Sequence, residues 1–82
     1  MTGDYDRAVE DYTKALEIDP NNQYIPYNIA IVYSIKNDAL NACRWLRKAI
    51  KNGYDDITWL NNDKYFDNIR GTNCLQAIMD SH

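Results

Sequence analysis

The sequence lacks the residues on which most catalytic sites depend. Its single histidine is the last residue, His82, so a Cys–His nucleophile pair would have to recruit the terminus. The three glycines are isolated, which excludes a glycine-rich phosphate loop. The acidic pairs Asp55-Asp56 and Glu10-Asp11 fit helix caps and solvated surface better than paired-carboxylate catalysis. We therefore expect no catalytic residues and a protein that is not an enzyme.

Long apolar runs and excess positive charge are also missing. No run approaches the roughly 20 apolar residues that a membrane-spanning helix needs, and no basic-then-apolar leader opens the chain. The net charge is −3, whereas nucleic-acid binding needs clustered Lys and Arg. The short basic stretch within residues 44–51 fits a solvated face near a helix C-terminus. We expect neither a membrane nor a nucleic acid as a partner.

Only two cysteines are present, Cys43 and Cys74, and they lie far apart in the sequence without metal-ligand spacing. Both have apolar neighbours, which favours small buried side chains over reactive thiols. No N-x-Ser/Thr sequon accompanies them, so we expect a reduced, cytoplasmic setting. We also expect no metal and no cofactor.

The strongest positive feature is a pattern that returns after 34 residues. Four residues of the first segment have counterparts at this spacing: Ala8, Tyr12, Ala15 and Leu16 return as Ala42, Leu46, Ala49 and Ile50. Small residues with a large one between them describe a helix face that lets a neighbouring helix come close. A period of 34 residues is typical of stacked helix–turn–helix units.

Hydrophobic periodicity predicts three longer helices, over residues 4–18, 25–36 and 39–51. Asp19-Pro20 ends the first of them, Asn37-Asp38 ends the second and caps the third, and Asn52-Gly53 offers a left-handed stop. From residue 55 onward the pattern predicts three short amphipathic helices, which are marginal alone and must dock on the longer ones. No strand pattern competes, so the predicted fold is all-α.

Residues 3–22, with Ala8, Ala15 and Pro20 in place, resemble the second helix and exit turn of a tetratricopeptide repeat. Residues 27–53 resemble a complete second repeat, although Pro26 stands where the family has a large residue. Residues 53–70 are similar to the short helices that cap such arrays. The resemblance implies an antiparallel helix-turn-helix array, an α-solenoid fragment, with repeats over residues 1–54 and capping helices over residues 55–82.

The resemblance also implies a binding groove, because the first helices of successive repeats in this family line a concave surface that receives an extended peptide or a helix. The groove residues that it implies are Tyr24, Tyr27, Asn28, Ile31, Ser34 and Ile35. Asn28 resembles a clamp asparagine of some family members, but the basic residues that complete such a clamp have no counterpart. A nearly neutral, tyrosine-rich groove suits amphipathic or apolar segments. Alternatively, these side chains pack against a neighbouring repeat or the C-terminal segment.

The first helix corresponds to the second helix of a hairpin, so we expect part of its apolar stripe to face water. Either the chain is a fragment of a longer array, or another copy supplies the missing surface. We expect self-association into a homo-oligomer through Val9, Tyr12 and Leu16. The predicted function is a non-catalytic scaffold or adaptor that presents its groove to a protein or peptide partner. The alternative is an accessory or regulatory module of a larger enzyme whose catalytic domain lies elsewhere.

Overall fold

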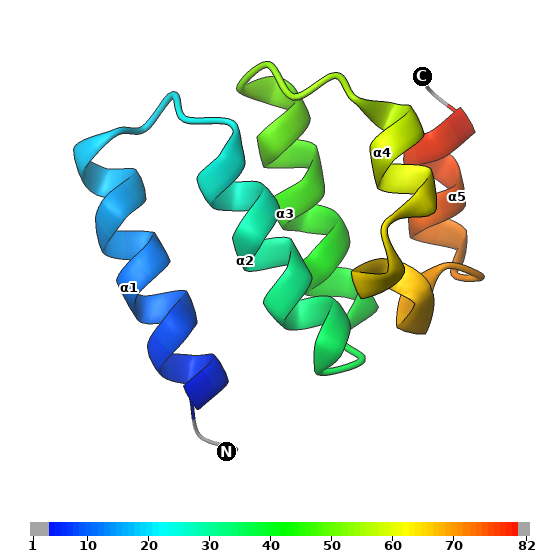
Figure 1. Cartoon of the computed structure of the whole chain (residues 1–82), viewed down its shortest axis with the longest axis horizontal. Coiled ribbons are helices and arrows are strands. Elements are labelled where there is room, and N and C mark those ends of the chain that lie inside the picture. Colours follow the sequence, from blue (N-terminus) through cyan, green and yellow to red (C-terminus); the bar gives the residue numbers. More distant parts are fainter. Residues whose placement is uncertain (1–3, 81–82) are drawn as a thin grey trace.

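Six helical segments form the protein in its computed structural model, which describes residues 4–80 (Figure 1). Their bounds are α1 Asp4–Ile18, α2 Tyr24–Ile35, α3 Ala39–Lys51, α4 Ile57–Asn62, the 3-10 helix η1 Lys64–Ile69, and α5 Asn73–Asp80. No strand occurs within residues 4–80, which confirms the all-α fold class.

The three longer helices α1, α2 and α3 run antiparallel to their neighbours, with α2 between the other two (Figure 1). Because α2 is covered on several sides, half of its twelve residues are buried, whereas no residue of α1 is buried. On α3, Ala42, Leu46 and Ala49 are 0% exposed. The two alanines of the pattern on α3 are therefore fully covered by neighbouring elements, as the 34-residue pattern predicted.

Local side chains fix where these helices begin and end. The Asn22 carboxamide oxygen accepts hydrogen bonds from the first two amides of α2, at 2.7 and 2.9 Å. Pro26 lies in the first turn of α2, where the missing amide hydrogen leaves no bond broken. The Asp38 carboxylate caps α3 by accepting from the Asn41 amide at 3.3 Å. Gly53, with φ of 116°, reverses the chain after α3, a conformation that favours glycine.

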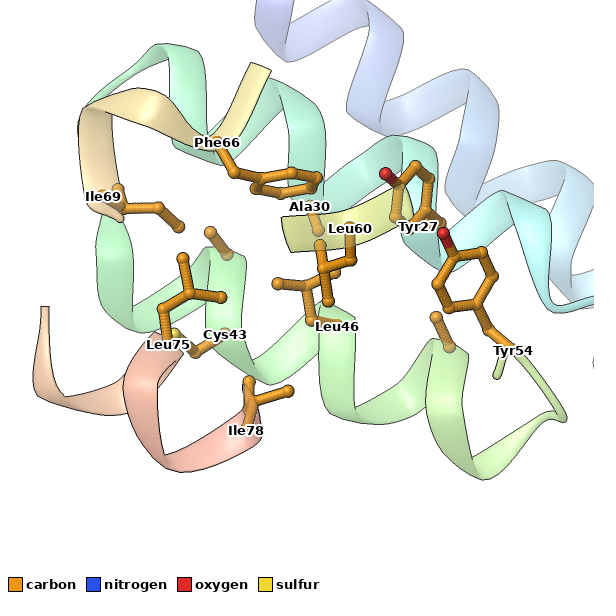
Figure 2. Packing of buried hydrophobic residues seen from close by; sticks show 12 residues of the cluster. Tyr27, Ala30, Cys43, Leu46, Tyr54, Leu60, Phe66, Ile69, Leu75 and Ile78 are labelled. Atoms are coloured by element: carbon orange, nitrogen blue, oxygen red, sulfur yellow. The ribbon is translucent and has the colours of Figure 1, made fainter. Parts of the chain in front are cut away.

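The C-terminal segment folds back over the α2–α3 pair and completes the core (Figure 2). Asp56 and Asp63 cap α4 and η1, each accepting a backbone amide at 3.0 Å. The segment contributes five apolar side chains that are at most 2% exposed: Leu60, Phe66, Ile69, Leu75 and Ile78. These side chains join those of α2 and α3 in one cluster, so residues on both sides of position 54 share a core.

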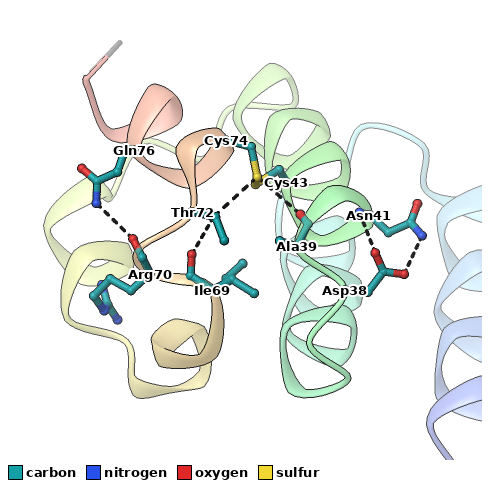
Figure 3. The surroundings of a disulfide bond; sticks show 9 residues. All are labelled: Asp38, Ala39, Asn41, Cys43, Ile69, Arg70, Thr72, Cys74 and Gln76. Carbon is teal, nitrogen blue, oxygen red and sulfur yellow. Dashed lines mark hydrogen bonds between the residues drawn. A yellow bond between two sulfur atoms is a disulfide. The ribbon is translucent and has the colours of Figure 1, made fainter.

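The two cysteines form a disulfide that joins α3 to α5 (Figure 3). Their Cα atoms lie 6.2 Å apart, although 31 positions separate them in the sequence. The expectation of reduced cysteines is therefore not met, whereas the expected burial holds for Cys43, which is 2% exposed. Packing of α5 against α3 brings the pair together, and the turn before α5 is held by the Thr72 hydroxyl, which donates to the Ile69 carbonyl at 2.6 Å.

Candidate functional site

The start of α2 and the loop between α3 and α4 lie at the same end of the bundle (Figure 1). A hollow of about 490 Å³ is lined by residues of these two segments and of α4. We call it the aromatic-acidic hollow. Its lining residues are Gln23, Tyr24, Tyr27 and Asn28 from the start of α2, and Tyr54, Asp55, Asp56 and Trp59 from the loop and α4. Its volume lies within the range typical of ligand-binding clefts.

Two stacked tyrosines form the wall of this hollow. The rings of Tyr27 and Tyr54 lie 4.7 Å apart between centroids at an interplanar angle of 26°, and the edge of Phe66 meets Tyr27 at 5.5 Å (Figure 2). Both tyrosine side chains are buried. Aromatic contacts of this kind hold side chains rigidly, so the wall is preformed.

The Tyr27 hydroxyl donates a hydrogen bond of 2.5 Å to the Asp63 carboxylate. Burial, followed by this bond, raises the pKa of Tyr27 far above its ordinary value, so the hydroxyl stays protonated and remains the donor. Asp63 is held in turn by its bond to the Tyr65 amide and by Arg70, whose guanidinium donates to the Asp63 carbonyl at 2.7 Å. The bond therefore ties α2 to the segment that carries Trp59.

The Tyr54 hydroxyl is buried and has no hydrogen-bond partner within residues 4–80. Burial raises the pKa of Tyr54, and the neighbouring Tyr27 hydroxyl opposes that rise. The two hydroxyl groups do not form a hydrogen bond with each other. Buried hydroxyls are nearly always paired, so this unpaired one is an exception, and it lies in the core behind the surface of the hollow.

The rim of the hollow is aromatic and acidic. Tyr24 and Trp59 are 61% and 62% exposed, although large aromatic side chains are usually covered. Asp55 and Asp56 supply two carboxylates, and one of them, Asp56, also caps α4. Among residues 4–80, no Lys or Arg lines the hollow. The rim can therefore contact a ligand through the exposed aromatic rings and through the two carboxylates.

The structure divides the six predicted groove residues. Tyr24, Tyr27 and Asn28 line the hollow together. Ser34 is 0% exposed and donates to the Tyr65 carbonyl at 2.7 Å, so the C-terminal segment covers it. Tyr27 is covered in the same way, as the alternative interpretation of these residues expected. The remaining two, Ile31 and Ile35, are half-buried on α2 away from the hollow.

Sequence reasoning missed the opposite side of the hollow, which consists of Tyr54, Asp55, Asp56 and Trp59. The only available signal was the Gly-Tyr-Asp-Asp turn after α3, because a sharp reversal there can bring the next residues back toward the start of α2. The pattern alone did not reveal which face of that turn would meet α2.

The predicted self-association residues Val9, Tyr12 and Leu16 are half-buried on α1. Leu16 lines a second hollow, of about 470 Å³, between α1 and α3. Trp45 lies there too, beside the basic residues Arg44 and Lys48. Trp45 is half-buried and packs against the core cluster.

Other site chemistries find no support within the described chain. No group of three or more His, Cys, Asp or Glu residues in positions 4–80 is arranged to hold a metal ion. None of the helices described is both long and apolar enough to span a bilayer.

Three antiparallel helices with close alanine contacts, followed by short helices that complete the core, define a helical-repeat protein. Residues 2–34 match the family model described as TPR repeat, a range that includes α1 and most of α2. This match supports a tetratricopeptide repeat protein, as the sequence resemblance indicated. No curated protein and no solved structure matches it. Repeats of this family generally mediate protein–protein interaction.

Proposed function

We propose that this protein is a non-catalytic adaptor that presents the aromatic-acidic hollow to a peptide or helix of a partner protein. The observation that carries the proposal is the pair of exposed aromatic side chains, Tyr24 and Trp59, on opposite sides of a preformed hollow. Aromatic side chains are enriched at interface hot spots, since they bury much area with little loss of conformational entropy.

The support of the hollow fits a binding role. Its wall consists of tyrosines that are already ordered by stacking and by the bond from Tyr27 to Asp63, so a partner would not have to order them. Asn28 is half-buried beside them and offers a carboxamide to a peptide backbone. The hollow therefore combines a large aromatic contact area, ordered side chains and a polar group that can form hydrogen bonds.

Selection from a random phage-displayed peptide library tests this proposal. In a Trp45→Phe background, Trp59 is the only tryptophan, and we expect a selected peptide to shift its fluorescence emission. Tyr24→Ala should weaken binding about tenfold or more, as at an interface hot spot. Tyr65→Ala is the matched control, because this tyrosine is 50% exposed and lies outside the hollow. Selection of no peptide, or equal binding by both variants, would overturn the proposal.

A second proposal concerns α1, which we infer associates with another copy of the chain through Val9, Tyr12 and Leu16. The supporting observation is a difference between repeat-equivalent positions. Leu46 on α3 is 0% exposed, whereas its counterpart Tyr12 on α1 is half-buried because α1 has one neighbour fewer. A helix with an apolar stripe gains by covering the rest of it.

Sedimentation equilibrium tests self-association directly. We expect a concentration-dependent rise in mass for the natural chain and a monomer for Leu16→Glu. The control Leu40→Glu places the same charge at a side chain that is 70% exposed on α3. A natural chain that stays monomeric at every concentration contradicts the proposal.

The disulfide bears on where the adaptor acts. Disulfides persist in oxidising compartments and are rare in the cytosol. The expected reduced, cytoplasmic setting rested on the lack of a secretory leader and of a sequon, and it implied reduced cysteines, whereas Cys43 and Cys74 are paired. A cytoplasmic location therefore stays a prediction that requires this bond to be reduced there, and an oxidising compartment is the setting that the disulfide favours.

A further inference from the structure

We propose that the aromatic-acidic hollow receives a basic side chain, that of an arginine or lysine in an extended peptide of the partner. The inference rests on the proposed adaptor function and names the chemistry of its ligand. It follows from the charge of the hollow and from its exposed aromatic faces.

The hollow is negative on every side that carries charge. Asp55 and Asp56 line it, no Lys or Arg does, and Asp63 stands behind the wall with its carboxylate on the Tyr27 hydroxyl. The Asp55 side chain makes no hydrogen bond or ion pair with any other residue in the described chain. An unpaired carboxylate beside a concave surface attracts a cation and selects against acidic ligands.

The exposed aromatic rings favour an organic cation over a metal ion. Tyr24 and Trp59 present exposed rings at the rim, and a guanidinium or ammonium group is attracted to such rings when it lies over the face. A bare metal ion needs several converging oxygen ligands, and no such cluster is present within residues 4–80. An organic cation on a flexible stem satisfies both the rings and the carboxylates.

A pair of peptides that differ only in charge tests this inference. One is a short N-acetylated peptide with a single arginine between leucines, and the other carries citrulline, which is neutral and nearly the same shape. Both are titrated into the ¹⁵N-labelled chain. We expect the arginine peptide to shift the Trp59 indole resonance and the Tyr54 and Asp55 amides, and to bind about two- to fivefold more tightly than the citrulline peptide. Added salt should reduce that difference.

Asp55→Asn is the diagnostic variant, because it removes a carboxylate that bonds to nothing else in the described chain. It should reduce the preference for arginine about two- to fivefold. Asp11→Asn makes the same charge change on the exposed surface of α1 and should leave the preference intact.

The outcomes separate this inference from the adaptor proposal. Equal shifts by both peptides at the hollow would overturn the charge preference and leave the adaptor function standing. Shifts by neither peptide, while library-selected peptides still move Trp59, would also overturn the inference alone. Shifts by neither, with no library peptide selected, would overturn both.

Discussion

Reduction of the Cys43–Cys74 disulfide is the perturbation whose effect follows most directly from the structure. The bond joins α3 to α5 across a sequence separation of 31. In the chain-entropy treatment, opening a closed loop of this length costs about 3.7 kcal/mol of folding free energy at 25 °C, because the unfolded chain regains the conformations that the cross-link removed.

That amount is large for this protein. A chain of 82 residues is expected to have a free energy of unfolding of about 4–12 kcal/mol. The α5 helix has eight residues and would be marginal without its contacts to α3. Reduction should therefore remove a third or more of the total stability, and the loss should begin at α5.

Thermal unfolding followed by circular dichroism measures the effect. A change of about 3.7 kcal/mol corresponds to a fall in Tm of roughly 15–30 °C for a domain of this size when a phosphine reductant is present. Cys74→Ala should show the lower Tm with or without reductant. Mass spectrometry after alkylation under non-reducing conditions should find no free thiol in the natural chain.

Two results would refute this reasoning. A natural chain whose Tm changes by only a few degrees on reduction would mean that the loop is already restricted in the unfolded state. Complete alkylation without reductant would mean that the two sulfur atoms are not bonded in solution.

Three further predictions concern hydrogen bonds that the structure contains. Ser34→Ala should lower the free energy of unfolding by about 1 kcal/mol, measured by urea titration, because it removes the bond that the buried Ser34 hydroxyl donates to the Tyr65 carbonyl. Tyr27→Phe should cost about 1.5–3 kcal/mol in the same assay, since the lost bond ends on the Asp63 carboxylate, and an unchanged midpoint would contradict the assigned bond. Hydrogen bonds from Asn41 hold the pKa of Asp38 below its ordinary value of 3.8, so its contribution to stability is present above that pH and is lost as the pH falls through the lower folded value. Asp38→Asn should therefore flatten the acid limb of stability against pH.

The helices and their order were predictable from the sequence because the signals that fix them are local. Apolar spacing sets each helix face, and Asp38 and Gly53 end or begin helices through contacts with residues a few positions away. The start of α2 was predicted one residue too late. Its cap is the Asn22 side chain, which sits inside what the sequence presented only as a turn after Pro20.

The disulfide and half of the hollow were not predictable, because both depend on how distant segments meet. Cys43 and Cys74 come together only when α5 packs on α3, and no local spacing indicates that contact. In the same way, Trp59 faces the start of α2 because the chain reverses after Gly53. A short helix has several equally apolar ways to dock, and only the full core selects one of them.

The two copies of the repeat pattern show what the spacing of residues alone cannot predict. Ala8 and Ala15 on α1 occupy the same pattern positions as Ala42 and Ala49 on α3, yet the first pair is half-buried and the second is fully buried. Spacing of small residues therefore predicts that a helix can be approached closely, while the neighbours present decide how much surface is covered.

The same reasoning explains why the C-terminal segment has two effects on the structure. By covering α2 and α3 it completes the core around Leu46, and by stopping short of Tyr24 it leaves one concave, aromatic surface uncovered. The position of that single segment thus determines both the stability of the fold and the location of its candidate binding site.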